Sequence, residues 1–436
     1  SGGTMTVVLG AAIVLLVATG PPRSLTALTT LSWLDDGRVD FVLYETGTAG
    51  DGEVAGAAVT GEARAGGDGA LDPGPDALST EPPAAPVPDY TFPGLKDRDI
   101  YVFAIEAYGY ATFSRERMAE LVGPARERFA DALRAEGYEF RSNFLLSPVA
   151  GGFSWLAEAT FLTGQWIDSQ NAFLQLYDAD LPTLTGMLHD GGYYTFTLKP
   201  GTVHASWPEG WDLFRFEEAM VAFDGDFNYA GPWFYYVPIT DQFTLWAAHN
   251  RIAELTAPDG PAANAPLLAY YQLVSSHTPF NKIPPLIERW EDLGDGSVYH
   301  ERENEIRTFN NSWGGGTEMD EGYSTAISYV FNSLGKYVED KMDLSRDPLI
   351  IVFGDHQAQR PIREQEAHLS IPIHIASRDP EILALFEEEG YRPGLDGGQP
   401  PPHPRMSTFF PTFARIAMRE PERVVRGEAS TAGPAR

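Results

Sequence analysis

Short apolar runs alternate with amphipathic segments between Tyr90 and Met418, and this alternation most narrows the folds open to the chain. Five runs rich in β-branched and aromatic residues are typical of buried strands: Asp99–Glu106, Tyr193–Leu198, Pro266–Val274, Pro348–Phe353 and Leu369–Ile375. Five further segments have the pattern of helices: Ser114–Glu136, Leu181–Asp190, Thr240–Leu255, Met319–Met342 and Pro380–Glu389. Strands alternating with helices predict an α/β fold, with a mainly parallel central sheet and helices on both faces.

Polar residues at strand ends are the first candidates for a site, because α/β folds bind ligands outside the carboxyl ends of their strands. Glu106 ends the first predicted strand and comes shortly before Gly109. A carboxylate at this place is costly to bury unless it is paired, hydrogen-bonded or bound to a metal. The alternative is a glutamate that caps the next helix.

An Asp-His pair follows another predicted strand. Asp355 and His356 come directly after Pro348–Phe353 and Gly354, and the glycine frees the backbone so that both side chains can turn toward one cation. A carboxylate beside an imidazole suits Mn²⁺, Zn²⁺ or Fe better than Ca²⁺. The alternative is that Asp355 and His356 are ordinary polar residues of a loop and bind no metal.

Ser154 lies between a glycine pair, Gly151 and Gly152, and an apolar helical pattern that stops at Gly164. We therefore expect it at the N-terminal end of a short helix, where backbone N–H groups and the helix dipole favour an alkoxide or a phosphate oxygen. The same position also suits a serine that simply caps the helix.

Two further segments carry histidines after predicted strands. His277 stands in Ser-Ser-His-Thr-Pro-Phe after Pro266–Val274, while His204 and Trp207 follow Tyr193–Leu198. A histidine in a loop is commonly a solvated side chain, so each is a candidate only in combination with the others.

The charge balance limits the partners of the chain. It has 31 basic and 61 acidic residues, a formal net charge of −30, and no cysteine. Nucleic acid is excluded as a partner because the carboxylates repel phosphates. Disulfide scaffolds, thiol enzymes and cysteine-ligated zinc sites are excluded too. An anionic substrate would need a local positive charge, for which a bound metal is the obvious source.

The N-terminal region differs in amino-acid composition from the rest of the chain. Met5–Gly20 is an uncharged run of sixteen apolar or small residues. Residues 1–23 are therefore predicted to be a single apolar helix, the truncated remainder of a transmembrane segment. A cleaved signal and a buried core helix are the alternatives. Residues 24–90 are predicted to be a largely disordered linker, since Gly47–Pro88 is rich in Gly, Ala, Pro and Asp. Residues 91–418 form the predicted catalytic domain and 419–436 a flexible tail.

The order of the motifs resembles the alkaline phosphatase and sulfatase superfamily. A strand ending in Glu106, a Gly-rich turn before Ser154, Ser-x-His-x-Pro-Phe around His277 and Gly-Asp-His at 354–356 carry the resemblance. Within the superfamily they are most similar to the lipoteichoic acid synthase-like branch of phosphoglycerol transferases. The closing Thr-Phe-Phe-Pro-Thr-Phe-Ala-Arg at 408–415 looks like the C-terminal signature of that branch.

This resemblance implies roles for individual residues. It implies that Glu106, Ser154, Asp355 and His356 bind one divalent metal, Mn²⁺ above all, with Zn²⁺ or Mg²⁺ as alternatives. Ser154, where the branch usually has threonine, would be the nucleophile. The remaining implied site residues are a substrate-binding and proton-donating His277, a pocket lined by His204 and Trp207, and an acid at Glu158. The proline and arginine of a sulfatase motif do not follow Ser154, which disfavours sulfatase activity.

The implied function is a phosphoryl-type transferase at the cell membrane, with its catalytic domain outside the cytoplasm. It would move phosphoglycerol or a similar head group from a phospholipid to an envelope glycan or polymer through an adduct on Ser154. A phosphodiesterase or phosphatase on the same residues and a non-catalytic envelope-binding domain are the alternatives.

Overall fold

The computed structural model of the chain comprises two units, Ser1–Pro83 and Ala84–Arg436. It describes residues 90–179, 181–203, 213–313, 315–363, 367–398 and 401–419, together with strand segments 3–9, 12–18, 25–33, 38–45 and 58–64. The predicted tail over 419–436 lies outside the described residues except for Arg419.

The described part of the first unit consists of antiparallel strands. β1 (Gly3–Leu9) pairs with β2 (Ala12–Ala18), and β3 (Leu25–Trp33), β4 (Arg38–Glu45) and β5 (Ala58–Arg64) form a three-stranded sheet. The apolar helix expected over the N-terminal run is therefore not found, and its described residues are extended instead. Its β-branched residues, such as Val7, Val8, Ile13 and Val14, favour strands over helices.

Among the described residues, no helix is both long enough and apolar enough to span a membrane. Membrane attachment through residues 1–23 thus stays a prediction. Strands β3, β4 and β5 lie within the range predicted to be linker, and the other residues of 24–89 lie outside the described ones, so the extent of the linker also stays a prediction.

The second unit is built on an eight-stranded sheet. Its strands are β6 (Ile100–Ile105), β7 (Glu139–Leu146), β8 (Tyr194–Lys199), β9 (Glu218–Val221), β10 (Leu267–Leu273), β15 (Leu349–Gly354), β16 (Ser370–Ser377) and β17 (Arg392–Pro393), in the order β17-β7-β16-β15-β6-β10-β8-β9. Strands β15, β6, β10, β8 and β9 are parallel, whereas β16 runs antiparallel to both of its neighbours. The mainly parallel sheet is confirmed, and each predicted strand is present.

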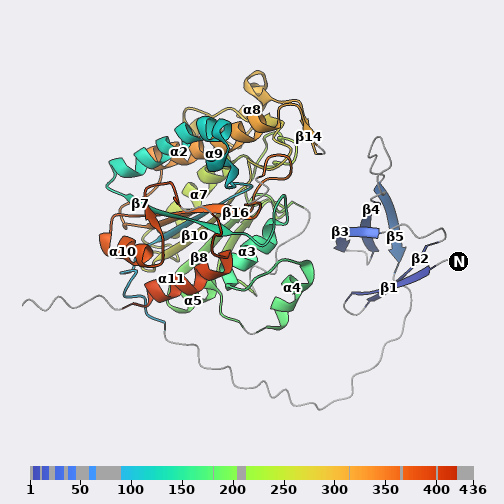
Figure 1. The fold of residues 1–436 in the computed structure, drawn as a ribbon, viewed down its shortest axis with the longest axis horizontal. Helices are drawn as coiled ribbons and strands as arrows, with labels where there is room; N and C mark the ends of the chain where they lie inside the picture. The colour runs from blue at the N-terminus through green and yellow to red at the C-terminus, as the bar shows by residue number, and fades with distance from the viewer. Residues whose placement is uncertain are drawn as a thin grey trace, which may run out of the picture. The chain divides into compact units, whose positions relative to one another are not determined.

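Helices cover both faces of this sheet (Figure 1). The helices used below are α1 (Ala111–Ser114), α2 (Glu116–Ala135), α3 (Ser154–Thr163), α5 (Leu184–Asp190), α7 (Asp241–Leu255), α9 (Met319–Asp340), α10 (Pro380–Glu388) and α11 (Phe409–Ala417). All five predicted helices are present. Ser114 ends α1 and does not cap α2, whose N-cap is Arg115; Gly137 follows α2 with φ +85°.

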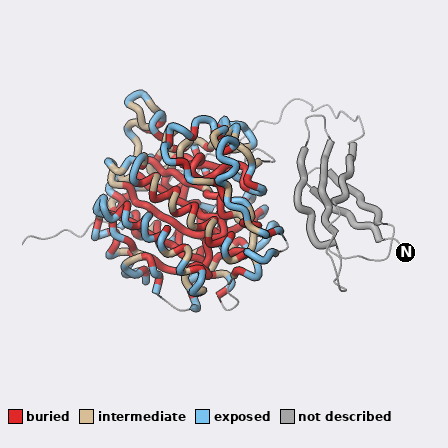
Figure 2. The backbone as a smooth tube through the Cα atoms, turned by 90° about the horizontal axis from the view of Figure 1, so that it is seen from above, coloured by how far each residue is buried: buried red, intermediate tan, exposed pale blue. Residues whose placement is uncertain are grey.

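The central strands are buried on both sides, which explains their unbroken apolar sequences. Along β6, Tyr101 and Phe103 pack into one buried cluster with residues of α2, α7 and α9, while Ile100 and Val102 pack into another with α3, α5, α10 and α11. Figure 2 shows this buried interior beneath more exposed loops and helix surfaces. Because both faces of the central strands are covered, a ligand can reach these strands at their ends.

Candidate metal centre and active site

The carboxyl ends of β6 and β15 bring two acids together. These strands are parallel neighbours in which Ile105 lies opposite Gly354, so Glu106 and Asp355 leave the sheet side by side. The Ala107 N–H donates to Asp355 Oδ1 at 2.8 Å, and the Asp355 N–H donates to the Ile105 carbonyl at 3.2 Å. These bonds hold the turn after β6, which carries Glu106, against the turn after β15, which carries Asp355.

His356 completes the group from the same turn. Its Nε2 lies 3.2 Å from Glu106 Oε1 and 3.6 Å from Asp355 Oδ2. Its Nδ1 lies 2.9 Å from the Gln357 carbonyl oxygen, which can only accept, so Nδ1 carries a proton. This hydrogen bond directs Nε2 toward the carboxylates, as in histidines that bind metals.

Ser154 joins this group as the first residue of α3. The turn before it has left-handed backbone at Gly151 (φ +78°) and at Phe153 (φ +68°). The Ser154 hydroxyl donates to Glu106 Oε2 at 2.9 Å, and its Oγ lies 3.3 Å from His356 Nε2. The structure thus brings the four residues proposed as metal ligands to one point, beside the N-terminus of a helix.

The electrostatics of this group favour a cation. One ligand atom each from Glu106, Asp355 and His356 lies within 4.8 Å of the others, and all three residues are buried. Burial and then the charge of Glu106 raise the pKa of Asp355 to about 7. Burial alone would raise the pKa of Glu106, but the charge and hydrogen bond of His356 outweigh it and lower this pKa to about 2.

Burial likewise opposes the charge on His356, yet the charges of Asp355 and Glu106 raise its pKa to about 9. Two carboxylates this close repel each other unless a positive charge stands between them. Oxygen donors combined with an imidazole nitrogen form a set that suits a divalent transition metal. These residues therefore fit a divalent cation.

His277 lies at the same edge of the sheet, after β10. Its charge is among those that lower the pKa of Glu106, and its neighbour Ser276 donates from Oγ to the Glu106 carbonyl at 2.6 Å. Its Nδ1 lies 2.7 Å from the Thr278 carbonyl oxygen. The two other predicted substrate residues, His204 and Trp207, lie outside the described residues.

Lys199 is a residue at the site that sequence reasoning missed. It ends β8 with a buried side chain whose ammonium group pairs with Glu158, one turn after Ser154 in α3. The available signal was a lysine at the end of a predicted buried strand, since lysine is almost never fully buried unless it is paired.

Asp241 was also missed. This fully buried residue begins α7, and its Oδ1 accepts from the N–H groups of Val274 and Ser275 at 2.7 and 3.0 Å. It therefore holds the turn that leads from β10 to His277. In the sequence, Asp241 follows the N-cap Thr240 and looks like an ordinary first-turn acid of a helix.

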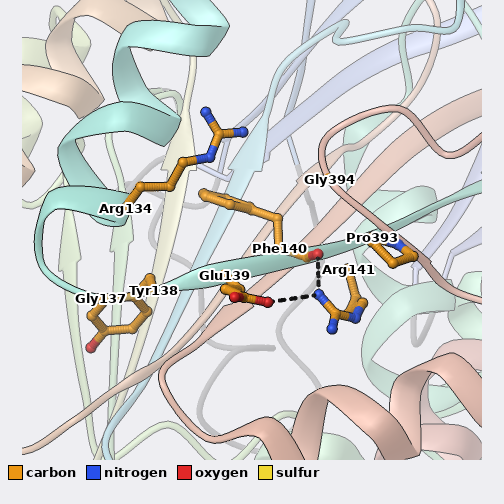
Figure 3. A pocket seen from close by; sticks show the side chains of 8 residues that line it. All are labelled: Arg134, Gly137, Tyr138, Glu139, Phe140, Arg141, Pro393 and Gly394. Carbon is orange, nitrogen blue, oxygen red and sulfur yellow. Dashed lines mark hydrogen bonds and ion pairs between the residues drawn. The ribbon is translucent and has the colours of Figure 1, made fainter.

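A surface pocket elsewhere is a poorer candidate (Figure 3). It lies at the connection between the end of α2 and the start of β7. Its lining residues include Arg134, Glu139, Phe140 and Arg141. Arg141 contacts Glu139 and the Phe140 carbonyl, as the dashed lines show, and it also pairs with Glu387. Arg134 pairs with Glu127 and Asp131. Both guanidinium groups are thus already neutralised, which leaves little attraction for an anionic substrate.

No protein-family model matches the chain, and no curated protein matches it in sequence. Among solved structures, it is similar to the lipoteichoic acid synthase LtaP from Listeria monocytogenes, with 17% identity, a TM-score of 0.42, and coverage of 65% of this chain and 66% of that one. It is also similar to a protein in the alkaline phosphatase superfamily from Vibrio parahaemolyticus, with 14% identity, a TM-score of 0.40, and coverage of 67% and 62%.

The phosphoglycerol transferase GacH from Streptococcus pyogenes, solved with sn-glycerol-1-phosphate, gives 13% identity, a TM-score of 0.38, and coverage of 65% and 71%. The chain spans less than two thirds of the length of the first two structures. These three proteins are named as members of the superfamily and of the branch that the motifs resemble.

Proposed function

We propose that the chain is a metal-dependent phosphoryl-type transferase with Ser154 as its nucleophile. The observation that carries this proposal is the Ser154 hydroxyl, which stands at the start of α3 and donates to Glu106 within the buried group of Glu106, Asp355 and His356. A hydroxyl so placed meets a candidate cation site and a helix N-terminus together, and both stabilise negative charge on oxygen.

Glu106, Asp355 and His356 would hold the cation, with Ser154 Oγ as a fourth ligand, and we propose Mn²⁺. When bound, such a cation lowers the pKa of a coordinated hydroxyl and offsets the charge of phosphate oxygens. The mixed oxygen and nitrogen donors favour Mn²⁺ or Zn²⁺ over Ca²⁺.

The residues of the chain then divide the work of the first step. Ser154 Oγ attacks phosphorus, an Oγ–P bond forms, and the bond to the leaving oxygen breaks with its electron pair on that oxygen. Glu106 Oε2 accepts the hydrogen bond of the Ser154 hydroxyl and so orients it, and the hydroxyl proton leaves to water. The N–H groups that open α3 stabilise the non-bridging oxygens, and His277 donates a proton to the leaving oxygen.

The second step returns the serine. A hydroxyl of an acceptor attacks phosphorus and gives its proton to His277, which restores the proton that His277 donated in the first step. The Oγ–P bond breaks with its electron pair on Oγ, and Ser154 Oγ takes a proton from water. We propose phosphoglycerol or a similar head group of a membrane lipid as the donated group, and an envelope glycan or polymer as the acceptor, outside the cytoplasm. The order of motifs and the apolar run near the N-terminus support this choice. With water as the acceptor, the same residues make a phosphodiesterase.

Nitrophenyl phosphodiester turnover tests the chemistry. The purified chain with Mn²⁺ should release nitrophenol. Ser154→Ala should reduce the rate at least about a thousandfold, because a covalent route needs the hydroxyl, whereas Ser154→Thr keeps a hydroxyl and should retain activity. Unchanged turnover in Ser154→Ala would remove this residue as the nucleophile. Mass spectrometry after incubation with an envelope lipid extract should show an adduct of phosphoglycerol mass on Ser154.

A further inference from the structure

Three aromatic rings pack against one another next to the candidate metal centre. Tyr236 and Trp313 have ring centroids 4.9 Å apart, and the His277 ring lies 5.9 Å from Tyr236 and 6.0 Å from Trp313. Tyr236 and Trp313 are nevertheless 51% and 52% exposed. We call these two residues the aromatic platform.

The platform is tied to the metal centre on two sides. His277 follows β10, and the Oγ of its neighbour Ser276 donates to the Glu106 carbonyl at 2.6 Å. The Trp313 carbonyl accepts a hydrogen bond at 3.2 Å from Nε2 of Gln359, three residues after His356. The rings therefore lie beside the segments that carry His277 and His356.

A second aromatic pair stands beside the nucleophile itself. Phe153 and Trp155, the neighbours of Ser154 in the chain, are both exposed, with ring centroids 5.4 Å apart. Large aromatic side chains left in water next to a reactive hydroxyl mark a binding surface, because burying them against a ligand is favourable.

The charge around the platform selects the ligand. The stretches 225–240 and 308–321, which carry Tyr236 and Trp313, contain no lysine or arginine, and their charged residues are Asp226, Glu318, Asp320 and Glu321. Arg307 precedes the second stretch, and Arg115 pairs with Asp320 at 3.6 Å. The two stretches themselves offer a polyanion no cation to bind. A neutral ligand with flat apolar faces and polar edges is favoured.

A pyranose ring has these properties, since its C–H face packs on an aromatic ring while its hydroxyls reach polar groups. Phenol and indole rings offer an apolar face and a polar handle together.

We propose that Tyr236 and Trp313 bind a neutral sugar ring of a glycan and so bring one of its hydroxyls toward Ser154. The sugar's role as the acceptor rests on the proposed transferase function, whereas its binding does not.

Calorimetric titration of the Ser154→Ala chain with neutral oligosaccharides tests the binding. The probes are maltopentaose, cellopentaose and a β-1,4-galactan pentasaccharide, each titrated separately. At least one should bind. Adding Trp313→Ala or Tyr236→Ala should weaken its Kd about tenfold, because aromatic residues dominate such contacts. Trp313→Tyr and Tyr236→Phe keep a ring and should stay within about threefold of the parent.

Two results would overturn the proposal: no binding of any probe, or binding that both alanine variants leave unchanged. Association with anionic phospholipid vesicles that Trp313→Ala abolishes, without sugar binding, would assign the platform to lipid instead. Nitrophenol release by the unsubstituted chain is measured in parallel. A chain that binds sugar through the platform but releases no nitrophenol would contradict the proposed function and leave the platform standing.

Discussion

The ammonium group of Lys199 and the carboxylate of Glu158 form an ion pair from which solvent is almost excluded, with side chains 2% and 9% exposed. Lys199 ends β8, and Glu158 lies one turn after Ser154 in α3. The pair therefore ties the helix that carries the nucleophile to the end of a sheet strand. Two charges this deep need each other, because each alone would be a buried unpaired ion.

We expect Lys199→Met to lower the free energy of unfolding by about 3 to 5 kcal/mol, since it leaves Glu158 buried without its cation. Adding Glu158→Leu should recover much of the loss. Urea unfolding measures both variants. The exposed pair of Arg302 and Glu305 is the control, where Arg302→Met should leave the free energy of unfolding unchanged. A Lys199→Met variant as stable as the parent would contradict the structural role of the pair.

Metal binding should stabilise the fold. Mn²⁺ at a hundred times its Kd adds about 2.7 kcal/mol to the free energy of unfolding, because only the folded chain gathers the three ligands. The midpoint temperature of thermal unfolding should rise when MnCl₂ is added and fall back when a chelator removes the metal. Asp355→Asn should abolish the shift, whereas the exposed Glu120→Gln should keep it. An undiminished shift in Asp355→Asn would refute the ligand set.

Gly354→Ala should damage both stability and metal binding. A Cβ atom at this position would lie 1.8 Å from the Tyr108 carbonyl oxygen, so the backbone before Asp355 has to move. We expect a loss of about 3 kcal/mol in urea unfolding and a lower metal content by mass spectrometry. Gly123→Ala is the matched control, because nothing lies within 4 Å of its added Cβ in α2. That variant should gain up to about 1 kcal/mol.

Asp241 should make stability fall as pH rises. Burial is the main cause that raises its pKa from 3.8 to about 7. The folded chain thus holds the proton more tightly than the unfolded chain, and this stabilisation is complete below about pH 4 and disappears as pH rises through about 7. Its magnitude is at most about 4 kcal/mol. The Asp241→Asn chain has no ionisable group at this position. Its free energy of unfolding should therefore fall less between pH 5 and pH 8 than that of the parent.

Urea unfolding in the presence of a chelator measures this pH effect without a contribution from bound metal. Comparing the variant with the parent at both pH values cancels the other titrating groups, Asp99 among them. Equal losses in the two chains would show that the Asp241 carboxyl does not titrate in this range.

The predictable parts of the fold and site are those that depend on residues next to one another in the sequence. The apolar run that becomes β15 is followed at once by Gly354, Asp355 and His356, so strand and ligands could be read together. Strand β7 was not predicted, because its polar residues are buried only through distant partners, as where Ser142 contacts His374 at 2.7 Å. The partner of Lys199 and the packing of Trp313 on Tyr236 are likewise products of the assembled sheet.

The hydrogen bond from Ala107 to Asp355 spans 248 residues of chain. Closing so long a loop is entropically costly, and contacts of this separation form late in folding. The centre can exist only once β6 and β15 are neighbours in the sheet. Metal uptake should therefore lag behind the appearance of secondary structure during refolding. A stoichiometric metal content would then report that β6 and β15 have paired in the native sheet.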